Sequence, residues 1–234
     1  MEYLTISDGQ FPRLAHSAVT MGKFDGIHRG HRKLIRRILE QKEETGAAAV
    51  VLAFVSDRKM ILTKAERRDL LERLGVDVLL ECPLDGRLKH MKAENFIKQI
   101  LVGSLHASYM AVGEDFRFGY ERKGTPDLLE KNGEKYGFVT EVLSKEMDGD
   151  RKISSTYIRE ELNRGNMEKT AGLLGCDFYV SGTVEHGRGM GHRTFFPTAN
   201  IIPPPEKLMP PNGVYITVSS FGAEVYPGIT NVGY

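Results

Sequence analysis

A glycine-rich turn near the N-terminus constrains the fold of this chain more than any other segment. Residues 22–31, GKFDGIHRGH, follow a short apolar run at 18–21 and lead into a helical pattern at 34–39. Glycines let the backbone come close to a phosphate, and a helix start supplies unpaired N–H groups and a partial positive charge. Strand, glycine-rich turn and helix, in this order, therefore predict a site for a nucleotide phosphate.

Two histidines stand at the end of this turn. His28 and His31 are three residues apart, so their imidazoles fall on one face once a helix begins and can reach the same phosphate. Two histidines on the surface or in the core are the alternative interpretation, because the His-x-Gly-His pattern alone is short. The strand before the pattern and the helix after it favour a binding site.

The composition leaves room for one large domain or two smaller ones. The chain has 234 residues, of which 41% are hydrophobic. Its 32 Lys and Arg residues nearly balance 31 Asp and Glu residues, which does not favour nonspecific binding of nucleic acid. No apolar run approaches the roughly 18 residues of a membrane span, and the N-terminus lacks the core of a signal peptide. We therefore expect a soluble cytoplasmic protein without membrane or nucleic-acid partners, with Cys82 and Cys176 as buried structural thiols.

Residues 17–160 alternate apolar runs with helical patterns. Continuous apolar strands separated by helices predict a parallel sheet covered on both faces, which is an α/β fold. Ligands of such folds bind at the carboxyl ends of the strands, where both the turn at 22–31 and the segment 113–119 fall. The expected strands are residues 47–54, 76–80, 109–113 and 138–142, and the expected helices are residues 64–74, 93–101 and 126–136.

The pattern changes after about residue 176, where no helix is indicated. Strand-like runs at 178–184 and 214–218 flank a glycine-rich loop and a proline cluster, which predicts the beginning of an all-β domain. The last residues read as the middle of a strand, so we expect a partial β-barrel. An unpaired strand edge there predicts sensitivity to proteolysis or self-association through the incomplete β domain.

The segment 153–159, ISSTYIR, reads as the start of a helix. In one interpretation Ser154 or Ser155 only caps the helix and Arg159 is solvated. In the other, the hydroxyls and the capped N–H groups bind phosphate oxygens, and the Arg159 guanidinium donates two hydrogen bonds to a phosphate. The turn at 22–31 favours a second phosphate site, because phosphoryl or nucleotidyl transfer depends mainly on positioning and on neutralising charge.

The segment 113–119, GEDFRFG, places two aromatic residues and charged residues just beyond a strand end. It could be an ordinary loop with one buried phenylalanine. The alternative is an aromatic wall for a planar ring, with Asp115 accepting a hydrogen bond from that ring.

The glycine-rich segment 186–193 leads into FFPTAN at 195–200. A flexible hairpin followed by a strand is the simpler interpretation. The glycines could instead wrap phosphates, with the Thr198 hydroxyl and the Asn200 carbonyl as oxygen ligands for magnesium.

These four segments, in this order, resemble the prokaryotic bifunctional riboflavin kinase/FAD synthetase family, over essentially the whole chain. The resemblance implies a Rossmann-like FMN adenylyltransferase domain, related to other His-x-Gly-His nucleotidyltransferases, at residues 1–170. It further implies the first part of a riboflavin kinase β-barrel domain at residues 171–234. The implied substrates are ATP, with Mg²⁺, and FMN.

The resemblance also implies roles for single residues. His28 and His31 would contact the ATP phosphates and stabilise the charge that develops during transfer, and Arg159 would help to hold the β- and γ-phosphates. Asp115 would contact the flavin, and Phe116 would shape its pocket. The remaining residues implied to bind ATP are Gly22, Phe24, Asp25, Gly30, Ser154, Ser155 and Thr156, and Thr198 and Asn200 match the Mg·ATP motif of the kinase.

The chain departs from the family pattern at three places. No proline follows Phe54, His192 replaces the family's arginine, and Phe195 replaces its glycine. The sequence also ends before the strands that carry the kinase's catalytic carboxylate. We therefore predict transfer of AMP from MgATP to FMN, giving FAD and pyrophosphate, without riboflavin kinase activity. A flavin- or nucleotide-binding regulatory protein without catalysis and a nucleotidyltransferase for another phosphorylated acceptor are the alternatives.

Overall fold

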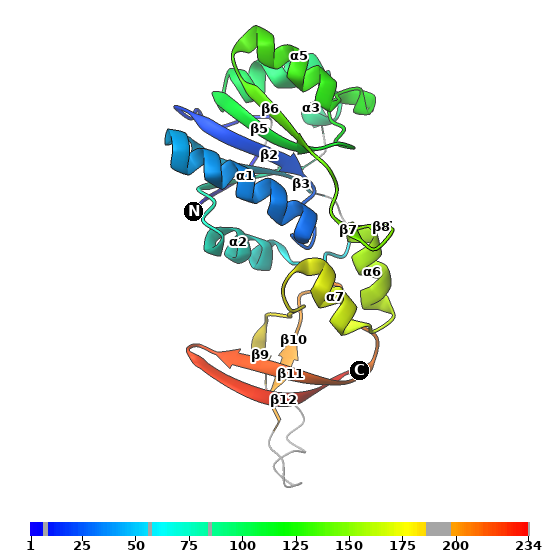
Figure 1. The fold of residues 1–234 in the computed structure, drawn as a ribbon. Coiled ribbons are helices and arrows are strands. Elements are labelled where there is room, and N and C mark those ends of the chain that lie inside the picture. The colour runs from blue at the N-terminus through cyan, green and yellow to red at the C-terminus, as the bar shows by residue number, and fades with distance from the viewer. Residues whose placement is uncertain (7–8, 56–57, 84–85, 186–197, 234) are drawn as a thin grey trace.

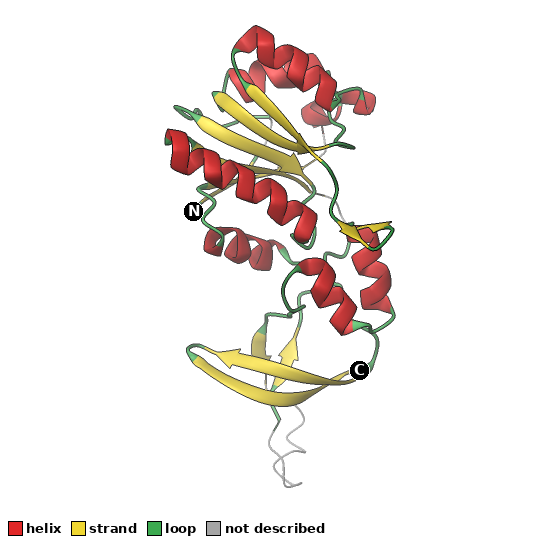
Figure 2. Cartoon of the chain, in the orientation of Figure 1, coloured by secondary structure: helices red, strands yellow, loops and turns green. Residues whose placement is uncertain are grey.

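The structure, a computed structural model, describes residues 1–6, 9–55, 58–83, 86–185 and 198–233. It has an α/β part built on a 6-stranded sheet and a C-terminal part of antiparallel strands (Figure 1; Figure 2). The α/β class is confirmed, and the antiparallel strands are consistent with a partial barrel.

The sheet is parallel throughout, and its strand order is β1-β4-β3-β2-β5-β6. Each strand expected in this part of the chain is present. The short edge strand β1 was not expected from the sequence; it pairs with β4. The bounds are β1 (Glu2–Thr5), β2 (Ser17–Gly22), β3 (Ala48–Val55), β4 (Val78–Pro83), β5 (Ala107–Gly113) and β6 (Val139–Leu143).

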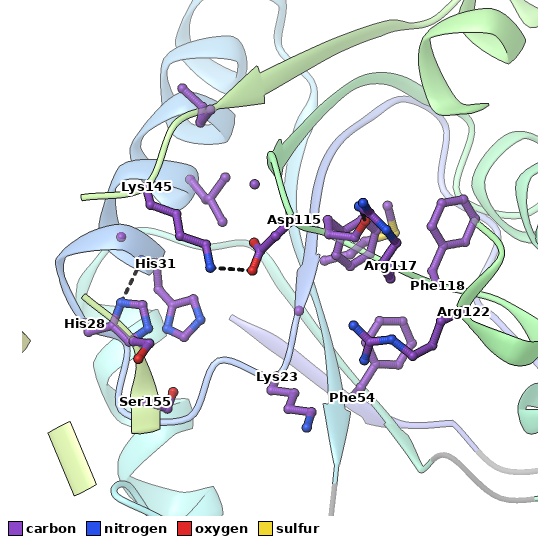
Figure 3. A pocket seen from close by; sticks show the side chains of 18 of the residues that line it. Lys23, His28, His31, Phe54, Asp115, Arg117, Phe118, Arg122, Lys145 and Ser155 are labelled. Atoms are coloured by element: carbon purple, nitrogen blue, oxygen red, sulfur yellow. Dashed lines mark hydrogen bonds and ion pairs between the residues drawn. The ribbon is translucent and has the colours of Figure 1, made fainter. Parts of the chain in front are cut away.

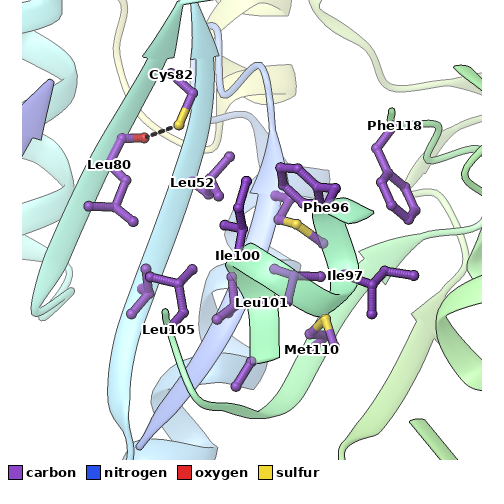
Figure 4. Packing of buried hydrophobic residues seen from close by; sticks show 14 of the residues in the cluster. Leu52, Leu80, Cys82, Phe96, Ile97, Ile100, Leu101, Leu105, Met110 and Phe118 are labelled. Atoms are coloured by element: carbon purple, nitrogen blue, oxygen red, sulfur yellow. Dashed lines mark hydrogen bonds between the residues drawn. The ribbon is translucent and has the colours of Figure 1, made fainter. Parts of the chain in front are cut away.

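Alternate residues of the central strands point to opposite faces of the sheet and fill two separate cores. One face packs against α1 (Arg29–Thr45) and α2 (Lys64–Arg73). Residues of the other face, such as Leu52 and Met110, pack against Phe96 and its helical neighbours (Figure 4). Because both faces are buried, the strands read as continuous apolar runs in the sequence.

The expected helix at 93–101 is helical but irregular. It begins as α4 (Ala93–Asn95) and continues as η1 (Phe96–Val102), which has the wider π-helical winding. The remaining helical elements of this part are α3 (Gly86–Lys89), η2 (Tyr120–Arg122) and α5 (Pro126–Tyr136).

A small hairpin and two helices lie below the sheet (Figure 1), and the two helices pack together with Ile61 and Ile153 in a third apolar cluster. Ile61 lies fully buried among the residues of these helices. The elements are β7 (Met147–Asp148), β8 (Arg151–Lys152), α6 (Ser155–Asn163) and α7 (Met167–Leu174). A domain boundary at residue 170 would fall within α7, and the division of the chain into two domains stays a proposal.

The C-terminal part contains two antiparallel pairs, β9 with β10 and β11 with β12. Apolar side chains of β11 and β12 face solvent: Ile216 is 95% exposed and Ile229, directly opposite it, is 79% exposed. The bounds are β9 (Thr183–Glu185), β10 (Asn200–Ile202), β11 (Gly213–Phe221) and β12 (Glu224–Val232).

One expectation about the C-terminal part and one about the cysteines were wrong. Residues 178–182 are not a strand, because the Tyr179 hydroxyl and the Ser181 backbone and side chain bond to Glu66 of α2 instead of to a neighbouring strand. Cys82 is buried as expected, but Cys176 is only half-buried, and its Sγ accepts a hydrogen bond of 3.1 Å from Arg32.

Within the described residues, no helix has the length and apolar character that a membrane span requires.

Candidate active site

A cavity of about 550 Å³ opens at the carboxyl ends of the strands (Figure 3). The chain moves from β2 through α1 to β3 on one side, whereas β5 pairs with β2 on the other. The strand order therefore reverses between β2 and β5, and this switch point is where open parallel sheets bind ligands. The cavity walls include strand ends from four strands: Gly22 of β2, Phe54 of β3, Gly113 of β5 and Leu143 of β6.

The turn after β2 has an unusual backbone that its buried side chains hold in place. Phe24 and Ile27 have φ angles of 47° and 42°, in the left-handed region that such residues rarely adopt, and Gly26 has a φ of 91°. Phe24 and Ile27 are fully buried, so packing fixes the turn. Phe24 therefore stabilises the turn by packing in the core and does not line the cavity. Gly22 and Gly30 do line it.

The two histidines form a stacked pair at the start of α1. Their ring centroids are 3.7 Å apart, and His28, the N-cap residue, accepts a hydrogen bond of 3.4 Å from the His31 backbone N–H. Both rings line the cavity (Figure 3), and the His31 Nδ1 is buried with no hydrogen-bond partner among the described residues.

The histidines are neutral at pH 7 in the free protein. Burial, helped by the charge of Lys145, lowers the pKa of His28 to about 4. Burial, helped by His28, also lowers the pKa of His31 well below its ordinary value. In this state each ring offers one N–H donor and one acceptor nitrogen.

The start of α6 faces the cavity next to the histidine turn. Ser154 caps the helix by accepting a hydrogen bond of 3.2 Å from the Tyr157 backbone N–H. Ser155 donates a hydrogen bond of 2.8 Å to the Asp25 carbonyl, which ties the helix start to the turn. Both serines line the cavity, so two helix starts, those of α1 and α6, meet at it.

Three of the sequence-predicted residues lie behind this wall. Thr156 is exposed and does not line the cavity. Asp25 and Arg159 form an ion pair: the Arg159 Nη2 lies 2.5 Å from the Asp25 carboxylate and 2.5 Å from the Lys59 carbonyl. The Arg159 guanidinium thus joins α6 to the turn, and its predicted contact with the ATP phosphates stays a prediction.

The other side of the cavity is aromatic. The rings of Phe116 and Phe118 stack with 5.5 Å between centroids, and Phe96 of η1 approaches Phe118 at 5.6 Å. Phe54 completes this wall (Figure 3). Asp115 lies at its edge in an ion pair with Lys145, and its side chain is 64% exposed.

Sequence reasoning missed several residues of the cavity. Lys145 follows the strand β6, so its position just after a strand end was a usable signal. Phe54 ends an apolar run in the same way. Basic side chains outnumber acidic ones among the lining residues, which suits ligands that carry phosphates: Lys23, Lys89, Arg117, Arg122 and Lys145 against Asp115, Glu121 and Glu146.

The residues predicted to hold magnesium lie outside this cavity. Thr198 and Asn200 are exposed, and Asn200 stands opposite Glu185 in the β9–β10 pair. His192 and Phe195 lie outside the described residues. The described part of the chain contains no group of three or more His, Cys, Asp or Glu side chains that could hold a metal ion.

Comparison with known protein families agrees with this geometry. The family model described as FAD synthetase matches residues 11–157. The chain belongs to the FAD synthetase family. The family model described as riboflavin kinase matches residues 174–234, which begin at the last residue of α7. The C-terminal part of the chain thus matches a second family model. The cavity lies within the FAD synthetase region, as all of its lining residues fall between Met21 and Ser155.

Relatives over most of the chain share one description. The bifunctional riboflavin kinase/FMN adenylyltransferase of Escherichia coli strain K12 is 37% identical over 226 residues, which cover 92% of this chain and 72% of that protein. The protein of the same description from Buchnera aphidicola is 34% identical over 230 residues, covering 94% and 73%.

A solved structure also shares the fold. A protein described as a macrolide-efflux protein from Streptococcus pneumoniae has a TM-score of 0.88 with this chain and is 27% identical to it. The match covers 100% of this chain and 79% of that one, so the two proteins share the arrangement of both parts.

Proposed function

We propose that this chain transfers the AMP group of MgATP to FMN, giving FAD and pyrophosphate. The observation that carries the proposal is a single cavity with two different sides. The histidine pair and the starts of α1 and α6 form one side, and the phenylalanine wall forms the other. One side suits the phosphates of ATP and the other suits a planar flavin ring, so a transfer between the two ligands can take place where the sides meet.

In this reaction a phosphate oxygen of FMN attacks the α-phosphorus of ATP in line. The new O–P bond forms as the bond between the α-phosphorus and the bridging oxygen breaks, and pyrophosphate leaves with that electron pair. The FMN phosphate is already an anion at pH 7, so the attack needs no general base. The protein's contribution is positioning and the stabilisation of charge on the leaving phosphates.

The histidines and serines would hold the phosphates of ATP. His28 and His31 offer N–H donors, and the nearby negative charge of a phosphate favours protonation of an imidazole. The helix starts add backbone N–H groups at Gly30 and Ser155. Mg²⁺ enters with ATP as part of the substrate.

The proposed roles of Asp25 and Arg159 are indirect. Asp25 accepts hydrogen bonds from Arg159 and from the Ile61 backbone N–H, at 2.5 and 2.8 Å. Arg159 thereby fixes the turn that carries His28 against α6. We assign both residues to positioning of the phosphate site.

The aromatic wall and Asp115 support FMN as the acceptor. Stacked phenylalanines offer a flat apolar surface to an isoalloxazine ring, and Asp115 offers a carboxylate to its polar edge. The loss of riboflavin kinase activity stays a prediction, as do the roles of Thr198 and Asn200 as ligands of Mg·ATP in that reaction. A cytoplasmic location is likewise a prediction.

The test is to incubate the purified chain with ATP and magnesium, plus either FMN or riboflavin, and to separate the flavins by chromatography. FAD formed from FMN supports the proposal, and untouched riboflavin supports the loss of kinase activity. Conversion of riboflavin to FMN would show that the kinase prediction is wrong.

A third arm replaces FMN with other phosphorylated acceptors. Faster pyrophosphate release with one of them would favour the nucleotidyltransferase alternative. Flavin binding without FAD or pyrophosphate would favour a regulatory protein.

A further inference from the structure

Lys207 is a fully buried lysine in the segment between β10 and β11. It lies outside the cavity walls. Its backbone neighbours pair with the loop before α2: the Met60 N–H donates to the Glu206 carbonyl at 2.6 Å, and the Leu208 N–H donates to the Met60 carbonyl at 2.7 Å. The C-terminal segment is therefore joined to the α/β part at Met60.

The Lys207 ammonium has two oxygen partners. It donates to Glu66 Oε2 and to the Ile61 carbonyl, both at 2.7 Å, and it lies 4.5 Å from the centre of the Phe178 ring. The Glu66 carboxylate is equally buried and also accepts hydrogen bonds from Thr63 and Ser181. Burial lowers the pKa of Lys207, while its hydrogen bond to Glu66 and the charge of Glu66 raise it.

Ile61 connects this buried pair to the histidine turn. Its backbone carbonyl accepts from Lys207, and its backbone N–H donates to the Asp25 carboxylate at 2.8 Å. Its side chain packs so closely on the turn that a Cβ at Gly26 would lie 3.2 Å from the Ile61 Cδ1. One peptide segment is thus held by Lys207 on one side and holds Asp25 on the other.

We propose that Lys207 is a positioning residue for the phosphate site: it fixes Ile61, and Ile61 fixes Asp25 and the turn that ends at His28. This inference rests on the proposed function, because it assigns ATP to the histidine side of the cavity. Lys207 does not touch the substrate. Its effect reaches ATP through two hydrogen bonds of one residue, Ile61, and through the packing of that residue under the turn.

A purely structural role is the competing explanation. Replacing a buried ion pair by neutral residues of similar volume often leaves stability unchanged, so the pair itself need not be essential for folding. A structural role would change the amount of folded protein, or would weaken both ligands alike. The proposed role weakens ATP binding and leaves FMN binding unchanged, because Ile61 belongs to a different apolar cluster from the phenylalanine wall.

The test compares two variants of the full chain. Glu66→Gln removes the counter-charge of Lys207 but keeps an oxygen that can accept from it; a buried lysine can release its extra proton, and the neutral amine still donates to the Ile61 carbonyl. The double variant Lys207→Met/Glu66→Gln removes that bond without leaving a buried charge unpaired. Calorimetry measures the affinity for ATP with magnesium in the absence of FMN, and quenching of flavin fluorescence measures the affinity for FMN.

We expect Glu66→Gln to bind ATP as the wild type does and the double variant to bind it about two- to thirtyfold more weakly. The affinity for FMN should be the same in all three proteins. A folded double variant with wild-type ATP affinity, or with equal losses for ATP and FMN, would overturn the inference. Lys42→Met is the control, since it breaks a lysine–carboxylate pair of 2.6 Å that does not touch Ile61.

A measurement on the wild type covers the case in which the double variant does not fold. Coupling is reciprocal, so bound ATP should slow hydrogen exchange at the Leu208 N–H, which bonds to Met60. Unchanged exchange there would overturn the inference. A wild type that binds ATP but forms no FAD refutes the proposed function alone, and a wild type that does not bind ATP refutes both.

Discussion

The strands of the sheet β1–β6 and those of the hairpin β11–β12 both carry apolar side chains but differ in what covers them. Leu52 and Met110 in the sheet are fully buried, whereas Ile216 and Ile229 in the hairpin are 95% and 79% exposed. Each face of the sheet has helices packed on it, and the apolar face of the hairpin has no partner in the described structure. An apolar pattern thus specifies a strand, and the burial of that strand depends on a second element.

The candidate active site lies in the α/β part and not in the exposed hairpin. All residues that line the cavity belong to the part with the closed core, where the turn and the helix starts are held by buried side chains. Among the described residues, the C-terminal part is joined to the site by the bond from Lys207 to Ile61 and by the packing of Leu208 on the apolar cluster that contains Ile61 and Ile153. The comparison therefore predicts large effects on catalysis from changes at the cavity and small ones from changes on the hairpin.

The largest expected effect comes from the phosphate side of the cavity. His28→Ala or Arg159→Ala should lower the rate of FAD formation by about 10²-fold or more, because each removes a group that binds or positions the phosphates. Steady-state kinetics with FMN and MgATP measure the effect. His90→Ala is the control, because His90 does not line the cavity and should leave the rate within about twofold. Unchanged turnover in both site variants would refute the assigned roles.

The aromatic wall should govern FMN alone. Phe116→Ala removes one of the two stacked rings and should raise KM for FMN by about tenfold while KM for ATP stays the same. The matched control is Phe221→Ala, which removes a phenylalanine of the hairpin whose side chain is 42% exposed. An equal change in both variants would show that the wall does not bind the flavin.

The histidine pair should make stability depend on pH. His28 is neutral in the folded protein down to a pKa of about 4, but the unfolded chain takes up the proton below about 6.5. Protonation of His28 therefore does not affect the free energy of unfolding above pH 6.5. As the pH falls from 6.5 toward 4, the free energy of unfolding decreases by on the order of 2–3 kcal/mol.

Urea unfolding at several pH values measures this effect. His28→Asn keeps a good N-cap residue but removes the titrating ring, so its stability should fall less between pH 6.5 and 4 than that of the wild type. Parallel curves over that range would contradict the assigned pKa.

The smallest effect on catalysis is expected at the hairpin. Ile216→Lys places a charge on the exposed apolar face and should leave FAD formation unchanged, while it reduces self-association through a second copy of this face. Sedimentation at increasing protein concentration measures the association. A wild type whose mass does not rise with concentration would show that the exposed face does not self-associate.

The sequence predicted the features that depend on neighbouring residues. The strands β3 to β6, the turn at 22–31 and the helix start at Ser154 each have a local pattern, and all three are confirmed. The stacking of His28 on His31 follows from their spacing at the start of α1.

Features that depend on distant residues were not predictable in this way. Residues 178–182 have the pattern of a strand, but their polar groups bond to Glu66, which lies more than 100 residues earlier in the chain. The ion pair of Arg159 with Asp25 joins residues that are 134 positions apart, so no local pattern indicates it, and the role of Arg159 at the phosphates stays a prediction.

The most direct test of adenylyl transfer is to follow the phosphates of ATP separately. The purified chain is incubated with FMN, magnesium and ATP labelled either at the α-phosphate or at the γ-phosphate, and the flavin product and pyrophosphate are then separated. The proposed reaction places the α-label in the flavin product and the γ-label in pyrophosphate. A γ-label in the flavin product, or no label in any flavin while pyrophosphate is absent, would contradict the proposal.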